Sequence, residues 1–316
     1  MQKVVPSYYN SFSCIKEKCK HNCCIDWEID IDRETAQKYR NVSGKIGKRL
    51  KANIAWDFSP HFILGEKERC PFLNEKNLCD IIISLGEKSL CDICREHPRF
   101  HNELPGRIES GLGLCCEAAA ELIIGQKEGA VLEFSGKKEC EDEIIDLRDK
   151  IFEVLQKREL SFEKREQEVL SLLKIKKPEL TSDFLFDFLF SLERLSEEWT
   201  EKLWLLKSRK KENVNAFSEY MKDRLFEYEN LAVYFIYRHF ANAPDFEEAT
   251  ARALFAIYGC EIIFLMGSAI YSETGAFTFE QQLELVRLFS SEIEYSDENL
   301  YAFFDMLKER EISGEF

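Results

Sequence analysis

The chain has 316 residues, of which 45% are hydrophobic and 13% aromatic, so it is not intrinsically disordered and can form one large or two ordinary domains. Its 14 glycines and 7 prolines exclude a collagen-like or low-complexity sequence. The formal net charge is −15, from 43 Lys and Arg against 58 Asp and Glu. We expect no nucleic-acid partner, because phosphate binding requires clustered cations, but an acidic chain can attract a lysine-bearing protein segment.

The first part of the chain, to about residue 120, is rich in Gly and Pro and predicts irregular structure. Two short helices are expected there, at 32–39 with Asp32 as N-cap and at 117–124. Residues 130–134 could form a strand, but no repeated alternation of apolar and polar residues indicates a large sheet. We therefore predict a cysteine-rich, metal-binding region over residues 1–130.

From about residue 141 the apolar residues recur at helical spacing, which predicts an α-helical bundle or array over residues 141–316. The fold class is therefore mainly α. A capping box is expected at Thr278, where Gln281 lies three residues later. The expected helices are 144–155, one from Ser161 that ends before Pro178, 182–206, 214–227, 229–241, 246–272, and two that begin at Thr278 and Ser296.

One apolar stretch, residues 253–271, has the length of a short membrane span but contains a charged residue, Glu261. A carboxylate is costly in the centre of a bilayer. We interpret the stretch as a buried helix of the helical domain, with no stable membrane insertion.

The distribution of the twelve cysteines is uneven. Ten precede residue 117 and only one lies in the last 176 residues. The N-terminal segment has no apolar region of the length that a secretory signal requires, so we expect a cytoplasmic protein. In a reducing compartment, clustered cysteines indicate metal binding or redox chemistry rather than disulfides.

The candidate metal ligands come from four separated segments. Cys19 and Cys23 are four residues apart and could bind one centre from a single helical turn, and Cys91-x2-Cys94 has the spacing of zinc knuckles and iron–sulfur loops. The spacing does not name the metal. The candidate ligands are Cys19, Cys23, Cys24, Cys70, Cys79, Cys91, Cys94 and Cys116. Cys14 and Cys115 are weaker candidates, and Cys140 and Cys260 are interpreted as structural, since buried cysteines often are small hydrophobes.

Several motifs follow one another in a fixed order along the chain. They are Cys-x4-Cys-x3-Cys-Cys, the run 26–32 (DWEIDID), Cys70-Pro-Phe-Leu, Leu78-Cys79, Leu85-Gly-Glu, Cys94-Arg-x2-Pro-Arg, 112–119 (LGLCCEAA) and 228–238 (YENLAVYFIYR). These motifs resemble those of the flagellin lysine-N-methylase family, which belongs to a broader CxxCxxCC group of zinc- or iron-chelating proteins. The resemblance spans nearly the whole chain, is specific in the first 120 residues and is loose after 141.

The resemblance implies an enzyme that transfers methyl groups from S-adenosylmethionine to lysine ε-amines of a protein, flagellin in the named family, with a [4Fe-4S] cluster bound by N-terminal cysteines. Zinc is the alternative metal. Cys115 stands where the family pattern has Ser, which favours Cys116 as the ligand of that pair. The sequence contains neither a Rossmann-type glycine loop nor a CxxxCxxC triad, so the S-adenosylmethionine pocket is not visible.

Methyl transfer requires a neutral amine, whereas the pKa of free lysine is about 10.4. Candidate acid–base residues are Glu117, His97 and Glu261, and Arg95 and Arg99 could bind the cofactor carboxylate or pair with Glu96 or Glu103. The acidic residues around the cysteines, Asp26, Glu28, Asp30 and Asp32, are interpreted mainly as a solvated face. Two other functions stay open: a non-catalytic zinc- or iron-binding interaction protein, and a redox or metal-storage protein with labile thiols.

Overall fold

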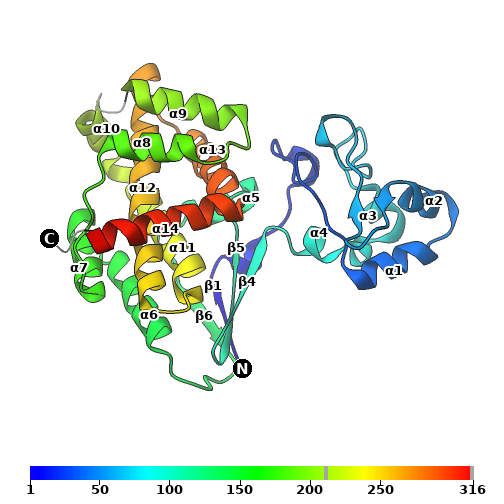
Figure 1. The fold of residues 1–316 in the computed structure, drawn as a ribbon, viewed down its shortest axis with the longest axis horizontal. Helices are drawn as coiled ribbons and strands as arrows, with labels where there is room; N and C mark the ends of the chain where they lie inside the picture. The colour runs from blue at the N-terminus through cyan, green and yellow to red at the C-terminus, as the bar shows by residue number, and fades with distance from the viewer. Residues whose placement is uncertain (210–212, 314–316) are drawn as a thin grey trace. The chain divides into compact units, whose positions relative to one another are not determined.

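The computed structural model describes residues 1–209 and 213–313, and over these residues the protein is mainly helical, as predicted (Figure 1). The chain forms two compact units. Unit 2 is Ser13–Phe100 with Cys116–Ala118, and unit 1 comprises Met1–Phe12, His101–Cys115 and the described part of Ala119–Phe316. These bounds differ from the predicted regions 1–130 and 141–316, because strands from the beginning of the chain belong to the helical unit.

A four-stranded sheet forms in the order β4-β5-β1-β6. Strand β1 pairs parallel to β5, with Lys3 opposite Ile108, and antiparallel to β6, with Val4 opposite Phe134. The strand expected at 130–134 forms as β6, whereas β1, β4 and β5 were not predicted. The pairs that β1 makes join residues a hundred or more positions apart, which leaves no local signal. The strands are β1 (Gln2–Pro6), β4 (Arg99–Leu104), β5 (Arg107–Leu112) and β6 (Leu132–Ser135).

The helices of unit 1 surround the long helix α12 (Phe246–Thr274), which packs against α9, α11, α13 and α14 (Figure 1). The described helices of this unit are α6 (Glu143–Leu155), α7 (Phe162–Leu173), α8 (Ser182–Ser191), α9 (Glu197–Arg209), α10 (Val214–Tyr220), α11 (Phe226–His239), α12, α13 (Phe279–Phe289), the π-helical turn η7 (Ser290–Glu294) and α14 (Asp297–Ser313). The capping box predicted at Thr278 is confirmed.

Helix α12 is the one helix, among the residues that the structure describes, with the length and hydropathy of a membrane span. The rest of the protein buries 72% of its most apolar window. This degree of burial is that of a core helix in a soluble protein, which agrees with the interpretation of residues 253–271.

One predicted helix, 182–206, is in fact two helices, α8 and α9, separated by residues 192–196. The break depends on a tertiary contact. The buried carboxylate of Glu292 accepts hydrogen bonds from the backbone N–H of Leu195, at 2.8 Å, and from the hydroxyl of Ser196. The Ser196 hydroxyl in turn accepts from the backbone N–H of Trp199 at 3.1 Å, so it caps α9.

Unit 2 contains short elements around a small core. They are α1 (Arg33–Asn41), α2 (Gly44–Ala52), α3 (Asp80–Leu85), α4 (Asp92–Glu96), β2 (Ile54–Ala55) and β3 (His61–Phe62), and α5 (Glu117–Ile124) begins here and continues into unit 1. The predicted helices at 32–39 and 117–124 are confirmed, and the carboxylate of Asp32 caps α1 by accepting from the N–H of Thr35 at 2.8 Å. The four candidate ligand segments are all in this unit.

Candidate metal centre

Unit 2 contains all eight candidate metal ligands, and none of the twelve cysteines, all of which are among the described residues, forms a disulfide. Short elements position several of them. Cys19 directly follows the 3-10 turn η2 (Lys16–Lys18), while Cys79 and Cys91 are the N-cap residues of α3 and α4. Cys116 immediately precedes α5. The four segments that are distant in sequence are therefore parts of one compact unit.

Several of the candidate cysteines lie in or against the hydrophobic core of unit 2. Cys70 and Cys91 are buried among apolar side chains such as Ile29 and Phe62, with exposed fractions of 5% and 0%. The core also packs against three cysteines that are half-buried, namely Cys24, Cys79 and Cys94. These positions agree with the small-hydrophobe interpretation as well as with metal binding.

Hydrogen bonds between thiols connect the core cysteines to their neighbours. Cys24 bonds to both Cys23 and Cys70, and these bonds lower the pKa of Cys23 and Cys70 while they raise the pKa of Cys24. Cys91 and Cys94 form a second such pair, in which the bond lowers the pKa of Cys91 and raises that of Cys94. Cys24 and Cys94 are thus the donors of these bonds, and Cys23, Cys70 and Cys91 are the acceptors.

The carboxylate of Glu117, the residue after Cys116, binds the backbone that follows Cys19. The side chain of Glu117, at the start of α5, accepts hydrogen bonds from the backbone N–H groups of Lys20 and His21 at 2.9 and 3.1 Å. The thiol of Cys19 donates to the carbonyl of His21 at 3.3 Å. Burial, together with the negative charges of Glu117, Cys116 and Cys23, raises the pKa of Cys19 to about 12. The predicted acid–base residue Glu117 therefore holds the turn that carries Cys19.

The spacing of the sulfurs can be compared with what each metal requires. Tetrahedral zinc with Zn–S bonds of about 2.3 Å places its sulfurs about 3.8 Å apart. Among the residues that the structure describes, no three cysteine sulfurs lie within 4.8 Å of one another. The cysteine sulfurs of the described residues therefore do not form a preformed tetrahedral zinc site.

His97 is half-buried in unit 2 at the end of α4. Its ring packs edge-to-face on Trp27, with ring centroids 5.3 Å apart. Burial lowers the pKa of His97 to about 4, so the imidazole is neutral near pH 7. A base this weak cannot take the proton of a lysine ammonium, and the position favours a structural role.

The two predicted cofactor arginines differ in their environment. Arg95 is exposed and pairs with Asp92 and with Glu96, the latter at 3.1 Å, so the structure contains the Glu96 pairing that the sequence left open. Arg99, half-buried, begins β4. Both residues belong to unit 2.

Glu261 lies on α12 in unit 1, with a side chain that is 39% exposed. Its carboxylate pairs with Lys177 at 3.0 Å, and Glu166 contacts the same ammonium at 3.2 Å. The ring of Tyr258 lies 5.0 Å from this nitrogen. Although the sequence around Glu261 is apolar, its side chain therefore reaches a charged cluster at the edge of the core.

A buried polar network in unit 1 was missed by the sequence analysis, although its residues 234–238 lie in the stretch that carries the family resemblance. Glu294, which is 3% exposed as a residue, accepts from the hydroxyl of Tyr234 at 3.1 Å and contacts His239 Nε2 at 2.7 Å. Arg238 donates to the hydroxyl of Tyr234 at 2.6 Å. Burial would raise the pKa of Glu294, but Arg238 and His239 outweigh it and lower the pKa, so the carboxylate stays charged.

Gly113, two residues before Cys115, has a packing role in the same unit. A Cβ at Gly113 would lie 2.0 Å from the hydroxyl of Tyr295, and the guanidinium of Arg238 lies 4.7 Å from the centre of that ring. The backbone N–H of Leu114 donates to the hydroxyl of Tyr234 at 3.3 Å. The segment that ends in the two cysteines is thus fixed against α11 and η7 within unit 1.

Comparison with known protein families gives a match in the helical half of the chain. Residues 172–314 match the FliB lysine N-methylase C-terminal domain. The chain is 28% identical over 137 residues to the lysine-N-methylase of Salmonella typhimurium (strain LT2), covering 40% of this chain and 33% of that protein. It is 29% identical over 137 residues to the lysine-N-methylase of Salmonella choleraesuis, again covering 33% of that protein.

A third relative is the flagellar biosynthetic protein FliU of Salmonella muenchen, at 28% identity over 137 residues, which are 40% of this chain and 79% of that protein. The chain thus spans about a third of the length of the two lysine-N-methylases that it matches. No solved structure matches the chain. The family match lies in the half where the sequence resemblance was loose, and it includes the residues of the Glu294 network.

Proposed function

Because the chain is related to the flagellin lysine-N-methylase family over residues 172–314, we propose that it is a protein-lysine N-methyltransferase. The methyl donor is S-adenosylmethionine and the acceptor is the ε-amine of a protein lysine. The nitrogen lone pair attacks the sulfonium methyl, the carbon–sulfur bond breaks, S-adenosylhomocysteine leaves and the amine releases a proton. The family match of residues 172–314 is the observation that carries this proposal.

Two observations, the net charge of the chain and the name of one relative, suit a lysine-rich acceptor. The net charge of −15 attracts basic protein segments and disfavours nucleic acid. One relative bears the name of a flagellar biosynthetic protein, which makes flagellin the first acceptor to test. We propose flagellin, or another protein with exposed lysines, as the substrate.

We further propose that unit 2 binds a [4Fe-4S] cluster through Cys19, Cys23, Cys94 and Cys116. Two observations and the usual ligand number of such a cluster support this choice. The four are half-buried, as are Cys24 and Cys79, whereas Cys70 and Cys91 lie in the apolar core. The negative charges of Cys116 and Cys23 act on Cys19, and that of Cys23 acts on Cys94 together with those of Cys91 and Cys70, so the four thiols are electrostatic neighbours within the cysteine group. Four thiolates are also the usual ligand set of such a cluster.

The other cysteines then have a supporting role. The thiol of Cys24 donates to Cys23, so it can tune the electron density of that ligand sulfur. When bound, the cluster would supply redox or Lewis-acid iron and would add its binding free energy to the folding of a unit built from short elements. Glu117 would hold the loop of Cys19 in place.

Metal analysis of anaerobically purified protein tests the cluster. We expect a brown protein that absorbs near about 400 nm and contains four iron and four sulfide per chain, as a single cubane cluster requires. Replacing Cys19, Cys23, Cys94 or Cys116 by Ser should remove most of the iron, whereas Cys260→Ala, buried in α12, should retain it. A colourless protein with stoichiometric zinc would overturn the cluster assignment.

The methyltransferase proposal needs a separate assay. Cluster-loaded protein is incubated with labelled S-adenosylmethionine and flagellin, and methyl-lysine is identified by mass spectrometry. Transfer of label to lysine supports the enzyme. Absence of transfer to flagellin and to other lysine-rich proteins, with the cluster intact, would favour the alternative of a non-catalytic metal-binding interaction protein.

A further inference from the structure

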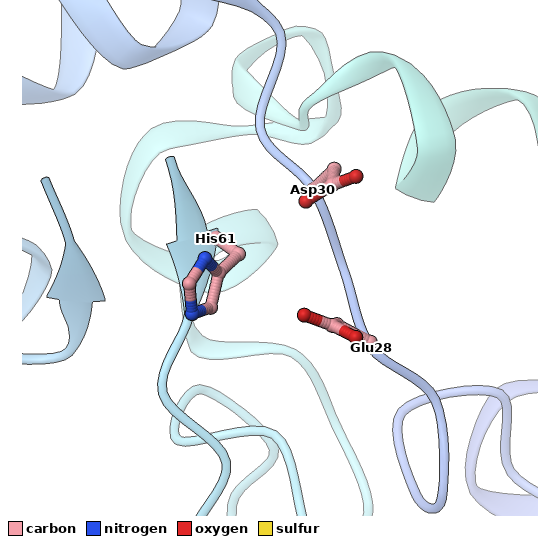
Figure 2. Close-up of side chains that lie close together, drawn as sticks. All are labelled: Glu28, Asp30 and His61. Atoms are coloured by element: carbon pink, nitrogen blue, oxygen red, sulfur yellow. The ribbon is translucent and has the colours of Figure 1, made fainter. Parts of the chain in front are cut away.

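Apart from the cysteines, unit 2 gathers a second set of ligand-bearing side chains, Glu28, Asp30 and His61. One ligand atom of each residue lies within 4.8 Å of the other two. Figure 2 shows one oxygen of each carboxylate turned toward the imidazole ring. Among the described residues, no other three His, Cys, Asp or Glu side chains satisfy this spacing.

The backbone that presents these three residues is fixed by the core. Residues 28–31 run antiparallel to residues 60–62, and two backbone hydrogen bonds of 2.7 and 3.1 Å join the segments. Ile29, Ile31 and Phe62 are only 2–3% exposed. Side chains alternate across extended segments, so the three ligand residues share the opposite, solvent-facing side. The arrangement is therefore built on anchored strands rather than on a free loop.

The imidazole of His61 is held in one orientation. Its Nδ1 lies 3.0 Å from the backbone carbonyl of Ser59. A carbonyl only accepts hydrogen bonds, so Nδ1 carries the proton, and in the neutral ring Nε2 keeps its lone pair. Histidines that bind metals commonly donate their other N–H to a backbone carbonyl in this way, which fixes the tautomer and the ring direction.

The charge of the group also favours a bound cation. Neither Glu28 nor Asp30 pairs with a Lys or Arg among the residues that the structure describes, and the hydroxyl of Ser59 donates to Asp30 Oδ1 at 3.4 Å. Asp57 lies 4.0 Å from His61 Nδ1 and adds further negative charge. Metal binding requires the deprotonated imidazole, and in that state the two carboxylates leave two negative charges that a divalent ion would neutralise.

We propose that Glu28, Asp30 and His61 form a binding site for a divalent first-row transition-metal ion. The mixed nitrogen and oxygen donor set indicates this class, because Mg²⁺ and Ca²⁺ prefer oxygen ligands alone and softer ions prefer thiolates. Bound there, the ion joins the segment that follows Cys23-Cys24 to β3. The site is independent of the proposed methyl transfer and of the iron–sulfur cluster.

Mn²⁺ is the suitable probe, since it binds carboxylate and imidazole but competes poorly for thiolates. Cluster-loaded full-length protein is titrated anaerobically with Mn²⁺, and the six-line EPR signal of the free ion is followed. We expect one saturable site per chain. Electron spin-echo modulation of the bound ion should show coupling to a single imidazole ¹⁴N in the unaltered protein, which requires no variant to fold.

Variants then locate the site. Glu28→Gln, Asp30→Asn and His61→Gln should each weaken Mn²⁺ binding by about tenfold or more. The control Glu34→Gln removes one negative charge from the exposed surface of α1 and should leave the affinity unchanged. The proposal is overturned if the unaltered protein shows no saturable Mn²⁺ site, if the ¹⁴N coupling is absent, or if the three variants bind as tightly as the Glu34→Gln control. In those cases His61 instead serves as a protonated partner of the two carboxylates.

Discussion

A single methyl group added at Gly113 would test how tightly the segment before Cys115 is held in unit 1. A Cβ on this residue would lie 2.0 Å from the hydroxyl oxygen of Tyr295 and 3.0 Å from its Cζ, whereas ordinary contacts begin at 3.4 Å. The ring cannot retreat freely, because Arg238 lies over it at 4.7 Å from the ring centre. Gly113→Ala must therefore displace either the ring or the backbone.

Overpacking of this kind in a well-packed interior costs roughly 1–3 kcal/mol. In domains of about 150–250 residues each kcal/mol lowers the melting temperature by about 2–4 °C, so we expect a decrease of roughly 2–12 °C. Removing the hydroxyl by Tyr295→Phe relieves the shortest contact but leaves the one at 3.0 Å. The double variant should therefore recover part of the lost stability.

The free energy of unfolding is measured by urea denaturation with far-ultraviolet circular dichroism. Gly65→Ala is a control, because its Cβ would meet nothing closer than the Arg69 carbonyl at 3.5 Å, and it should change the stability by less than about 0.5 kcal/mol. The packing argument fails if Gly113→Ala is as stable as this control. It also fails if Tyr295→Phe destabilises the Gly113→Ala protein as much as it destabilises the unaltered one.

Three further predictions concern buried charge, pH and metal. Glu109→Gln removes the charged partner of Arg148; both side chains are fully buried, and one of their hydrogen bonds is 2.9 Å long. The free energy of unfolding, measured by urea denaturation, should therefore fall by about 3–5 kcal/mol. A loss below about 1 kcal/mol would contradict this prediction. Burial lowers the pKa of His97 to about 4, below its ordinary value near 6.5, so the unfolded chain takes up the proton first as the pH falls. Stability should therefore decrease by up to about 3 kcal/mol between about pH 6.5 and pH 4, and His97→Gln should flatten this decrease; NMR titration of His97 near pH 6.5 would refute the effect. Removal of bound iron by a chelator should abolish hydrogen-exchange protection in residues 13–100 while α12 keeps its protection; loss of both together would show that the metal does not specifically organise unit 2.

The sequence allowed the helices with strong local signals to be predicted. Asp32 and Thr278 are caps whose oxygens bond to backbone N–H groups within the next three residues, so their effect is visible in a short window. The break at residues 192–196 was not predictable in this way. Its cause is the carboxylate of Glu292, about a hundred residues further along the chain, which accepts from Leu195 and Ser196.

The candidate cysteines of unit 2 and the buried network of unit 1 also differ in how far the sequence could predict them. The gathering of the candidate cysteines in one unit could be predicted, because clustered thiols in a reducing compartment indicate a shared metal centre. Their division into core and half-buried sets needed the structure. The buried network of unit 1 could not be predicted, because Glu294 and His239 look like ordinary surface residues in the sequence. Only the fold brings them to 2.7 Å of each other.

The parallel pairing of β1 with β5 constrains the order in which the nascent chain can fold. Strand β1 leaves the ribosome first, but its neighbour at residues 107–109 is translated about a hundred codons later, a delay of about 5–20 s at usual synthesis rates. During that interval residues 13–100 are already available to collapse, whereas Cys116 is still to come. The proposed cluster, which needs Cys116, could therefore be completed only after the residues of β5 have been synthesised.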